Sequence, residues 1–193
     1  MSALTEKVSQ TEIALHLART DAKLSEQFNA AADLIEACFR AGGKLLVCGN
    51  GGSAAQAQHF VAELTGRYLR DRPPLPAVAL TTDTSALTAI GNDLGFERVF
   101  SRGVAALGNA SDVLLAISTS GSSPNVLRAI KQGRIEKMST IGLTGSDGGN
   151  MSGKFYSLDC LLCVPATDTP TVQELHLVLL HALAGELERR MFG

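Results

Sequence analysis

The spacing of hydrophobic positions changes after the first 43 residues of the chain. Before that point, two amphipathic helical patterns cover residues 4–20 and 24–41, and the second stops at a pair of glycines, as helices often do. After it, short apolar runs alternate with helical stretches. We therefore expect one domain over residues 1–193, in which residues 1–43 form a helical segment packed on the remainder.

Five apolar runs in the second part predict strands. They are KLLVCG (44–49), PAVALT (76–81), DVLLAIS (112–118), MSTIGLT (138–144) and LDCLLCV (158–164). Continuous apolar strands separated by helices are typical of a parallel sheet that is covered on both faces. The pattern predicts an α/β fold in which helices sandwich a five-stranded parallel sheet, as in flavodoxin.

A long helix is predicted over residues 171–192, directly after Pro170. Its first half, LHLVLLHALAG, is apolar on most sides. A helix exposed along one side should carry a polar face, so this pattern favours burial in a subunit interface.

The composition excludes several classes of protein. Hydrophobic residues make up 45% of the chain and charged residues 19%, as in a globular protein with a sizeable core. A net charge of −2 and the lack of a basic run argue against a nucleic-acid partner. No apolar run reaches the roughly 18–20 residues of a membrane span, and the N-terminus does not resemble a signal peptide.

The cysteines are expected to be reduced and packed in a cytoplasmic protein. Cys160 and Cys163 have C-x-x-C spacing but lie in a predicted strand, and the other two are Cys38 and Cys48. A zinc knuckle would need a second pair with similar spacing, which this sequence lacks.

Glycine and hydroxyl residues follow the predicted strands, at the edge where open parallel sheets bind ligands. The segments are GNGGSA (49–54), TTDT (81–84), GND (91–93), STSGSS (118–123) and TGSDGG (144–149). None of them contains lysine or arginine.

The serine-rich loop, residues 118–123, is the strongest candidate for an anion site. Backbone N–H groups and hydroxyls at a helix start can bind phosphate without a cationic side chain. Helix capping would also explain hydroxyls here, but one or two would suffice. The glycine loop at 49–54 matches the dinucleotide pattern G-x-G-x-x-A only weakly, because Asp83 is poorly placed to bind a ribose.

A second cluster of candidate residues lies on two predicted helices. His59 and Glu63 are four residues apart and share a helix face, while Gln173, His176 and His181 lie on the C-terminal helix. Gln173 and His181 are about 80° apart around that helix and roughly 12 Å apart along it. Spacing alone leaves metal binding and a structural role equally open.

Several segments taken in order resemble the phosphoheptose isomerase family of the SIS domain superfamily. They are CGNGGSAAQAQHFVAELTGRY, DRPPLPAVALTTD, AIGND, SDVLLAISTSGSSPNVL, LTGSDGG and VQELHLVLLH, and they extend from about residue 44 to the C-terminus. The resemblance implies isomerisation of D-sedoheptulose 7-phosphate to D-glycero-D-manno-heptose 7-phosphate, an early step toward bacterial lipopolysaccharide or related glycans. It also implies a cytoplasmic homotetramer with one Zn²⁺ per subunit and active sites at subunit interfaces.

The resemblance also implies a set of site residues. The zinc ligands would be His59, Glu63, Gln173 and His181, with Glu63 and His181 as the base and acid pair. The substrate contacts would be Asn50, Gly51, Gly52, Asn92, Asp93, Ser118, Thr119, Ser120, Ser123 and Gln173.

Two other functions compete with this interpretation. A related SIS protein is a non-catalytic adaptor that binds the bacterial replication initiator protein, but an adaptor has no need for the four predicted zinc ligands. Another SIS isomerase, or a module that senses hexose or pentose phosphates, is the third possibility. A dinucleotide-binding enzyme ranks below both.

Overall fold

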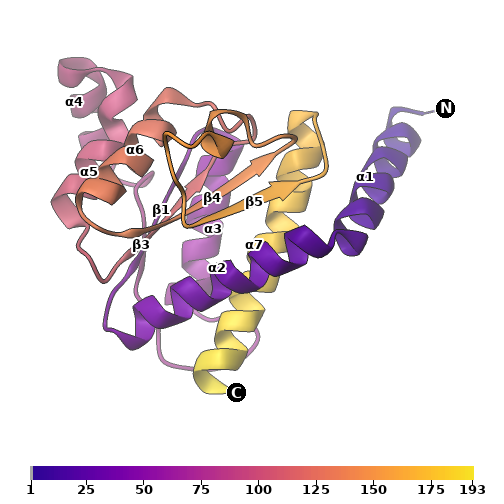
Figure 1. The fold of residues 1–193 in the computed structure, drawn as a ribbon, viewed down its shortest axis with the longest axis horizontal. Helices are drawn as coiled ribbons and strands as arrows, with labels where there is room; N and C mark the ends of the chain where they lie inside the picture. Colours follow the sequence, from indigo (N-terminus) through magenta and orange to yellow (C-terminus); the bar gives the residue numbers. More distant parts are fainter. Residues whose placement is uncertain (1) are drawn as a thin grey trace.

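A five-stranded parallel sheet forms the centre of the computed structural model, which describes residues 2–193 (Figure 1). Its strands are β1 (Leu45–Gly49), β2 (Ala77–Ala79), β3 (Val113–Ile117), β4 (Ser139–Gly145) and β5 (Cys160–Val164). Their order is β2-β1-β3-β4-β5, and every neighbouring pair is parallel. The predicted flavodoxin-like α/β fold is therefore confirmed.

Helices cover both faces of the sheet (Figure 1). They are α1 (Ala3–Thr20), α2 (Ala22–Arg40), α3 (Gly52–Thr65), α4 (Thr84–Leu94), α5 (Val99–Leu107), α6 (Pro124–Ile135) and α7 (Thr169–Phe192). Two 3₁₀ turns, η1 (Phe96–Arg98) and η2 (Gly149–Ser152), complete the elements. Helices α2, α3 and α7 pack on one face, and α5 and α6 on the other.

Strands β1 and β3 carry no polar side chain, because both of their faces are buried. In β3, Val113, Leu115 and Ile117 join the cluster beneath α2, α3 and α7, whereas Leu114 and Ala116 join the cluster beneath α5 and α6. This alternation follows from the two-residue period of a strand. Each fully buried leucine contributes about 2 kcal/mol through the hydrophobic effect.

Several predicted boundaries differ from the structure by one or two residues, and two of these differences are described here. Strand β2 has only three residues, because it lies at the edge of the sheet and pairs only with β1. Helix α7 begins at Thr169 instead of residue 171, because the Asp168 side chain accepts a hydrogen bond from the Thr171 amide. Pro170 fits within this first turn, where its missing N–H is not needed.

All four cysteines are free thiols, as predicted. Cys160 and Cys163 are three residues apart on β5, so their side chains point to opposite sides of the strand and cannot chelate one ion together. Burial raises the pKa of the Cys160 thiol to about 11. Within residues 2–193, no helix is long and apolar enough to cross a membrane.

Candidate active site

The glycine turn and the serine-rich loop meet where the strand order changes direction. The turn follows β1 and leads into α3, and the loop follows β3 and leads into α6 on the opposite face of the sheet. Ligands of open parallel sheets bind in the crevice at such a switch point. The structure therefore brings the glycine turn and the predicted anion-binding loop together at the carboxyl edge of neighbouring strands.

Three hydroxyls of the serine-rich loop converge. Ser118 Oγ lies 3.0 Å from Ser123 Oγ and 3.5 Å from Ser120 Oγ. Ser123 occupies the N-cap position of α6, but its side chain makes no capping hydrogen bond. Helix capping thus does not account for this hydroxyl, and a group of hydroxyl donors at a helix start suits an oxyanion. The same loop also contains Thr119, whose carbonyl accepts a hydrogen bond from the Gly145 amide at 3.2 Å.

A pair of side-chain amides connects the glycine turn to the start of α6. Asn50 Nδ2 donates to Asn125 Oδ1, and Asn125 Nδ2 donates to Asn50 Oδ1, each at 2.8 Å. Asn125 is buried, and its Oδ1 also accepts from the Val126 amide. Sequence reasoning identified Asn50 but missed Asn125, because the partner lies 75 residues away and only the sheet order brings the two together.

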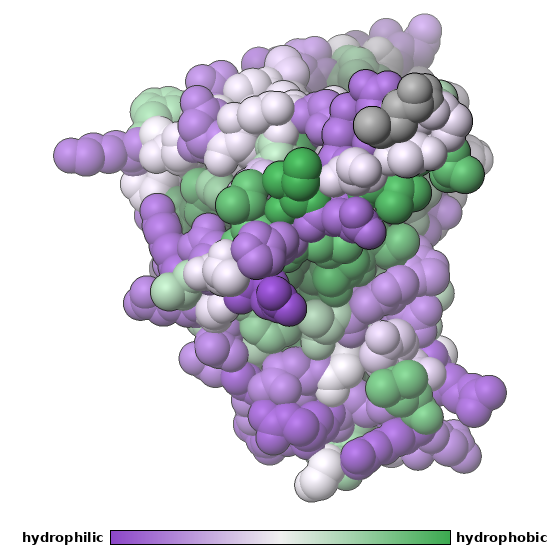
Figure 2. Space-filling view, turned by 90° about the vertical axis from the view of Figure 1, so that its right-hand side faces the viewer, coloured by the Kyte–Doolittle hydropathy of each residue, from purple (hydrophilic) through white to green (hydrophobic). Residues whose placement is uncertain are grey.

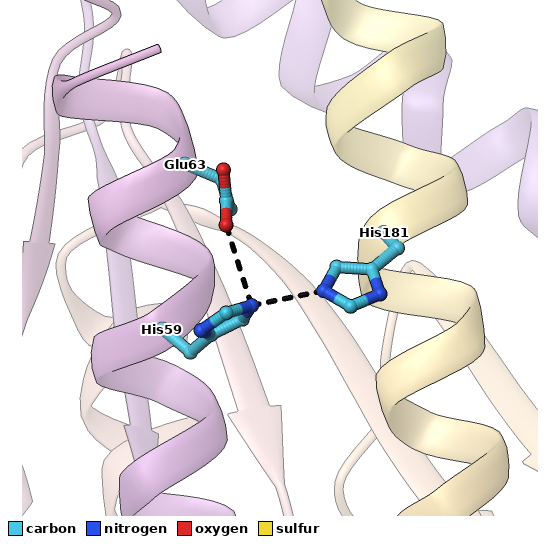
Figure 3. Close-up of side chains that lie close together, drawn as sticks. All are labelled: His59, Glu63 and His181. Atoms are coloured by element: carbon cyan, nitrogen blue, oxygen red, sulfur yellow. Dashed lines mark hydrogen bonds and ion pairs between the residues drawn. The ribbon is translucent and has the colours of Figure 1, made fainter. Parts of the chain in front are cut away.

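The histidine and glutamate cluster lies between two neighbouring helices, α3 and α7 (Figure 3). His59 Nε2 is 3.3 Å from Glu63 Oε1 and 2.9 Å from His181 Nε2. The donor atoms of the three residues all lie within 4.8 Å of one another. The expected i, i+4 pair on α3 is thus completed by a third ligand from a helix more than a hundred residues later in the chain.

This donor set fits a zinc ion. Two imidazole nitrogens and one carboxylate are a common set of three protein ligands at catalytic zinc, with a fourth position open. Tetrahedral bonds of about 2.0–2.2 Å place neighbouring donor atoms roughly 3.3–3.5 Å apart. The observed separations of 3.3 and 2.9 Å are close to this spacing. Without a metal, one imidazole must donate its Nε2 proton to the other.

Gln173, the fourth predicted ligand, lies nearer to the glycine turn. Its side-chain amide is so close to Gly52 that a Cβ added to Gly52 would collide with it. The backbone carbonyl of Gln173 accepts a hydrogen bond from Gln56 Nε2 at 2.6 Å. Gly52 is seven residues before His59 on α3, which is about 10 Å along the helix. Gln173 therefore lies beside the predicted substrate contacts Gly51 and Gly52, at the start of α3.

Asn92 and Asp93 lie apart from the two loops. They are exposed at the end of α4, where Asn92 Nδ2 donates to Asp93 Oδ1 at 2.8 Å. Asp93 lines a groove of about 630 Å³ between β2, α4 and α5. A separate pocket of about 250 Å³ is lined by Asn50, Ser123 and Asn125 together with Phe96 and Glu97 of η1. The segment that follows Asp93 thus reaches the glycine turn and the serine-rich loop, and it does so through the residues of η1.

A buried polar pair lies on the inner sides of α3 and α7. His176 is fully buried, and within residues 2–193 neither of its ring nitrogens has a hydrogen-bond partner. Gln56 Oε1 is also buried and unpartnered in that range. Burial lowers the pKa of His176 to about 4, against a smaller opposing effect of the Thr144 backbone. His176 is therefore neutral at pH 7.

Comparisons with known proteins agree with the fold and with the order of the motifs. The sequence profile of the SIS domain family matches residues 10–145. The phosphoheptose isomerase of Bordetella avium is 52% identical over 170 residues, which cover 88% of this chain and 86% of the relative. This chain belongs to the phosphoheptose isomerases of the SIS domain family. The phosphoheptose isomerase of Burkholderia pseudomallei is 47% identical over 193 residues, covering 100% of this chain and 96% of that one.

Solved phosphoheptose isomerases have the same architecture. The structure of the Neisseria gonorrhoeae protein superposes with a TM-score of 0.89 at 47% identity, over 96% of this chain and 97% of the other. That of the Francisella tularensis protein gives a TM-score of 0.90 at 39% identity, over 98% and 100%. The N-terminal helices and the long C-terminal helix are thus common to phosphoheptose isomerases and are not an addition specific to this chain.

Proposed function

We propose that this phosphoheptose isomerase converts D-sedoheptulose 7-phosphate to D-glycero-D-manno-heptose 7-phosphate. The observation that carries the proposal is the cluster of His59, Glu63 and His181. This cluster lies further along α3 than the crevice between the glycine turn and the serine-rich loop, where the phosphate is proposed to bind. The rise of α3 separates the two features by about 10 Å. A sugar phosphate of seven carbons is long enough to reach from one to the other.

The phosphate is proposed to bind at the serine-rich loop. Ser118, Ser120 and Ser123 turn their hydroxyls toward one point, and the N-terminus of α6 adds a favourable electrostatic potential. Thr119 belongs to the same loop. Asn50, Gly51 and Gly52 of the neighbouring turn are proposed to bind the sugar hydroxyls together with Gln173, and Asn92 and Asp93 complete the proposed set of substrate contacts.

The reaction moves one proton between neighbouring carbons. A base removes a proton from C1 of the ketose while an acid protonates the oxygen on C2, which gives an enediol. Return of a proton to C2 and loss of the proton on the C1 oxygen give the aldose. Glu63 and His181 are the proposed base and acid, because a carboxylate can accept a proton and an imidazole can donate one, and both side chains belong to the cluster.

The proposed cofactor is one Zn²⁺ per subunit, held by His59, Glu63 and His181 with Gln173 as the fourth ligand. When bound, zinc would polarise the oxygens of the substrate and so stabilise the negative charge that develops on them as the enediol forms. Glu63 has two carboxylate oxygens, and only Oε1 faces His59. Its second oxygen is available to exchange a proton with the substrate.

A cytoplasmic homotetramer with active sites at subunit interfaces is proposed as the working form, and lipopolysaccharide or a related glycan as the end of its pathway. Val178 of α7 is 50% exposed although it is apolar. It borders a groove of about 470 Å³ with Leu15, Leu24 and Phe28, and Figure 2 shows hydrophobic side chains gathered on the side of the molecule where α1 lies. A second subunit would cover this surface, and the free thiols suit a reducing compartment.

The test is to incubate the purified protein with sedoheptulose 7-phosphate and follow aldoheptose 7-phosphate by NMR. We expect turnover that stops after chelation and returns with zinc. Glu63→Gln should lower kcat by at least about a hundredfold, since it removes a proton-transferring group. Glu26→Gln, an exposed change on α2, is the matched control. No product from a folded protein with zinc would contradict the proposal and favour the adaptor function, which nothing in the structure supports.

A further inference from the structure

A buried ion pair lies beneath the proposed metal site. Arg72 Nε is 3.3 Å from Glu188 Oε2, and the two side chains are 2% and 3% exposed. Arg72 follows α3 in the chain, whereas Glu188 lies near the end of α7. The pair therefore joins the two helices that carry the proposed metal ligands.

The guanidinium of Arg72 also closes the carboxyl end of α3. Its Nη2 donates to the carbonyl of Glu63 at 2.7 Å, and its Nη1 donates to the carbonyl of Leu64 at 2.6 Å. The last carbonyls of a helix have no partner within the helix, and a positive charge is favourable at that end. One of these two carbonyls belongs to Glu63 itself, so the position of Arg72 is coupled to the backbone of a proposed ligand.

Glu188 lies on the same face of α7 as His181. Seven residues separate them, which is two helical turns or about 10 Å. Gly185 lies between them on this face, and the ring of Tyr68 is near enough that a Cβ on Gly185 would approach it to 3.3 Å. The same tyrosine ring stacks on His181, with centroids 6.0 Å apart and an angle of 20° between the planes.

The carboxylate of Glu188 holds the segment that carries Tyr68. Its Oε1 accepts a hydrogen bond from the Leu69 amide at 3.3 Å, while its other oxygen faces Arg72. The connection after α3 is therefore tied to α7 at two points, one of them next to Tyr68.

We propose that Arg72 and Glu188 are positioning residues that fix the end of α3 and the Tyr68 segment against α7, and so set the spacing of the His59, Glu63 and His181 donor atoms. The inference rests on the proposed metal site. Neither residue touches a donor atom of that site; both act through the backbone of Glu63 and through Tyr68.

A role in stability alone does not explain this pair well. Replacing a buried ion pair by apolar residues is often neutral or stabilising, so a buried ion pair is weak evidence for a contribution to stability. Misplacement of a reacting group by 1 Å can cost about a hundredfold in rate, which makes the orientation of α3 relative to α7 important for catalysis. Near the end of α7, Arg190 is more exposed than this pair; it binds Glu186 of the same helix and Glu36 of α2 instead.

The experiment measures zinc affinity by titration calorimetry, separately from turnover, in the full chain. We expect Glu188→Gln and Arg72→Lys to weaken zinc binding by about tenfold or more, as changes behind metal ligands do. Each should lower kcat and leave KM for the sugar phosphate within about twofold, because the phosphate loop is distant. Glu186→Gln, on the same helix but paired with exposed Arg189, is the matched control and should bind zinc normally.

A second variant guards against loss of folding. Gly185→Ala introduces only a methyl group against Tyr68 and raises helix propensity, so it should fold. It should weaken zinc binding severalfold without touching the ion pair or any ligand. Normal zinc affinity and kcat in folded Glu188→Gln, or in Gly185→Ala if the former unfolds, would overturn the positioning role. A wild-type protein that binds no zinc would instead refute the metal site, and the positioning role with it.

Discussion

His176 is a neutral imidazole in a fully buried position, and its titration should be visible in the stability of the protein. Burial lowers its pKa to about 4 in the folded state, from 6.5 for an imidazole in water. Between these values the unfolded chain binds more protons than the folded one, so stability falls as the pH falls from about 6.5 to about 4. The expected loss is roughly 3 kcal/mol.

The check is urea unfolding of the wild type and of His176→Leu at pH 7.5 and pH 4.5. The leucine variant should lose less unfolding free energy over this range, by about 2–3 kcal/mol, because it lacks the titrating group. An identical pH dependence in the two proteins would show that His176 becomes protonated without cost in the fold.

Gly121 allows the serine-rich loop to lie directly on the loop that follows β4 and contains Gly148. It has a φ of +62°, and a Cβ at this position would collide with the carbonyl oxygen of Gly148. We expect Gly121→Ala to lower the unfolding free energy by about 2–4 kcal/mol, through backbone strain and overpacking, and to raise KM. Gly42→Ala is a matched control, since Gly42 has a φ of +75° but nothing within 4 Å of the added atom. It should cost only about 1 kcal/mol in unfolding free energy and leave KM unchanged.

At the scale of elements, the amide pair Asn50–Asn125 holds the turn before α3 against the start of α6. Asn125→Ala removes both hydrogen bonds and leaves a polar group of Asn50 without its partner. We expect a loss of about 2–3 kcal/mol of unfolding free energy and a higher KM, because the two halves of the anion crevice are no longer joined.

A double-mutant cycle with Asn50→Ala separates this coupling from general destabilisation. The two changes should be non-additive by about 1–2 kcal/mol in unfolding free energy. Additive effects would mean that the two amides stabilise their loops independently.

The elements were largely predictable because their burial is uniform. All five strands were predicted within two residues at each end, since strands buried on both faces leave continuous apolar runs. Edge strand β2 was overestimated, because an apolar run does not show how many of its residues find a pairing partner. The start of α7 was misplaced by two residues, because it depends on which side chain caps the helix.

At the scale of the whole molecule, the apolar groove between α1, α2 and α7 should control assembly. Val178→Asp places a charge in it, and we expect the proposed tetramer to dissociate to smaller species, because a buried charge without a partner is costly. Light scattering coupled to size-exclusion chromatography measures this directly. Lys154→Gln changes the net charge equally at an exposed loop outside the groove and should leave the assembly intact. A tetramer that survives Val178→Asp would place the interface elsewhere.

The sequence by itself determined the α/β class, the five strands, the hydroxyl-rich loop after β3 and the pairing of His59 with Glu63. All of these depend on local periodicity or on residues within one turn of helix. The tertiary structure alone decided which distant residues meet. It brought His181 to His59, joined Asn125 to Asn50 and placed the Gln173 side chain against Gly52. It also buried Arg72 against Glu188. These contacts depend on the order of strands in the sheet and on the packing of α7 beside α3. Neither can be predicted from a short stretch of sequence, because both depend on residues far apart in the chain.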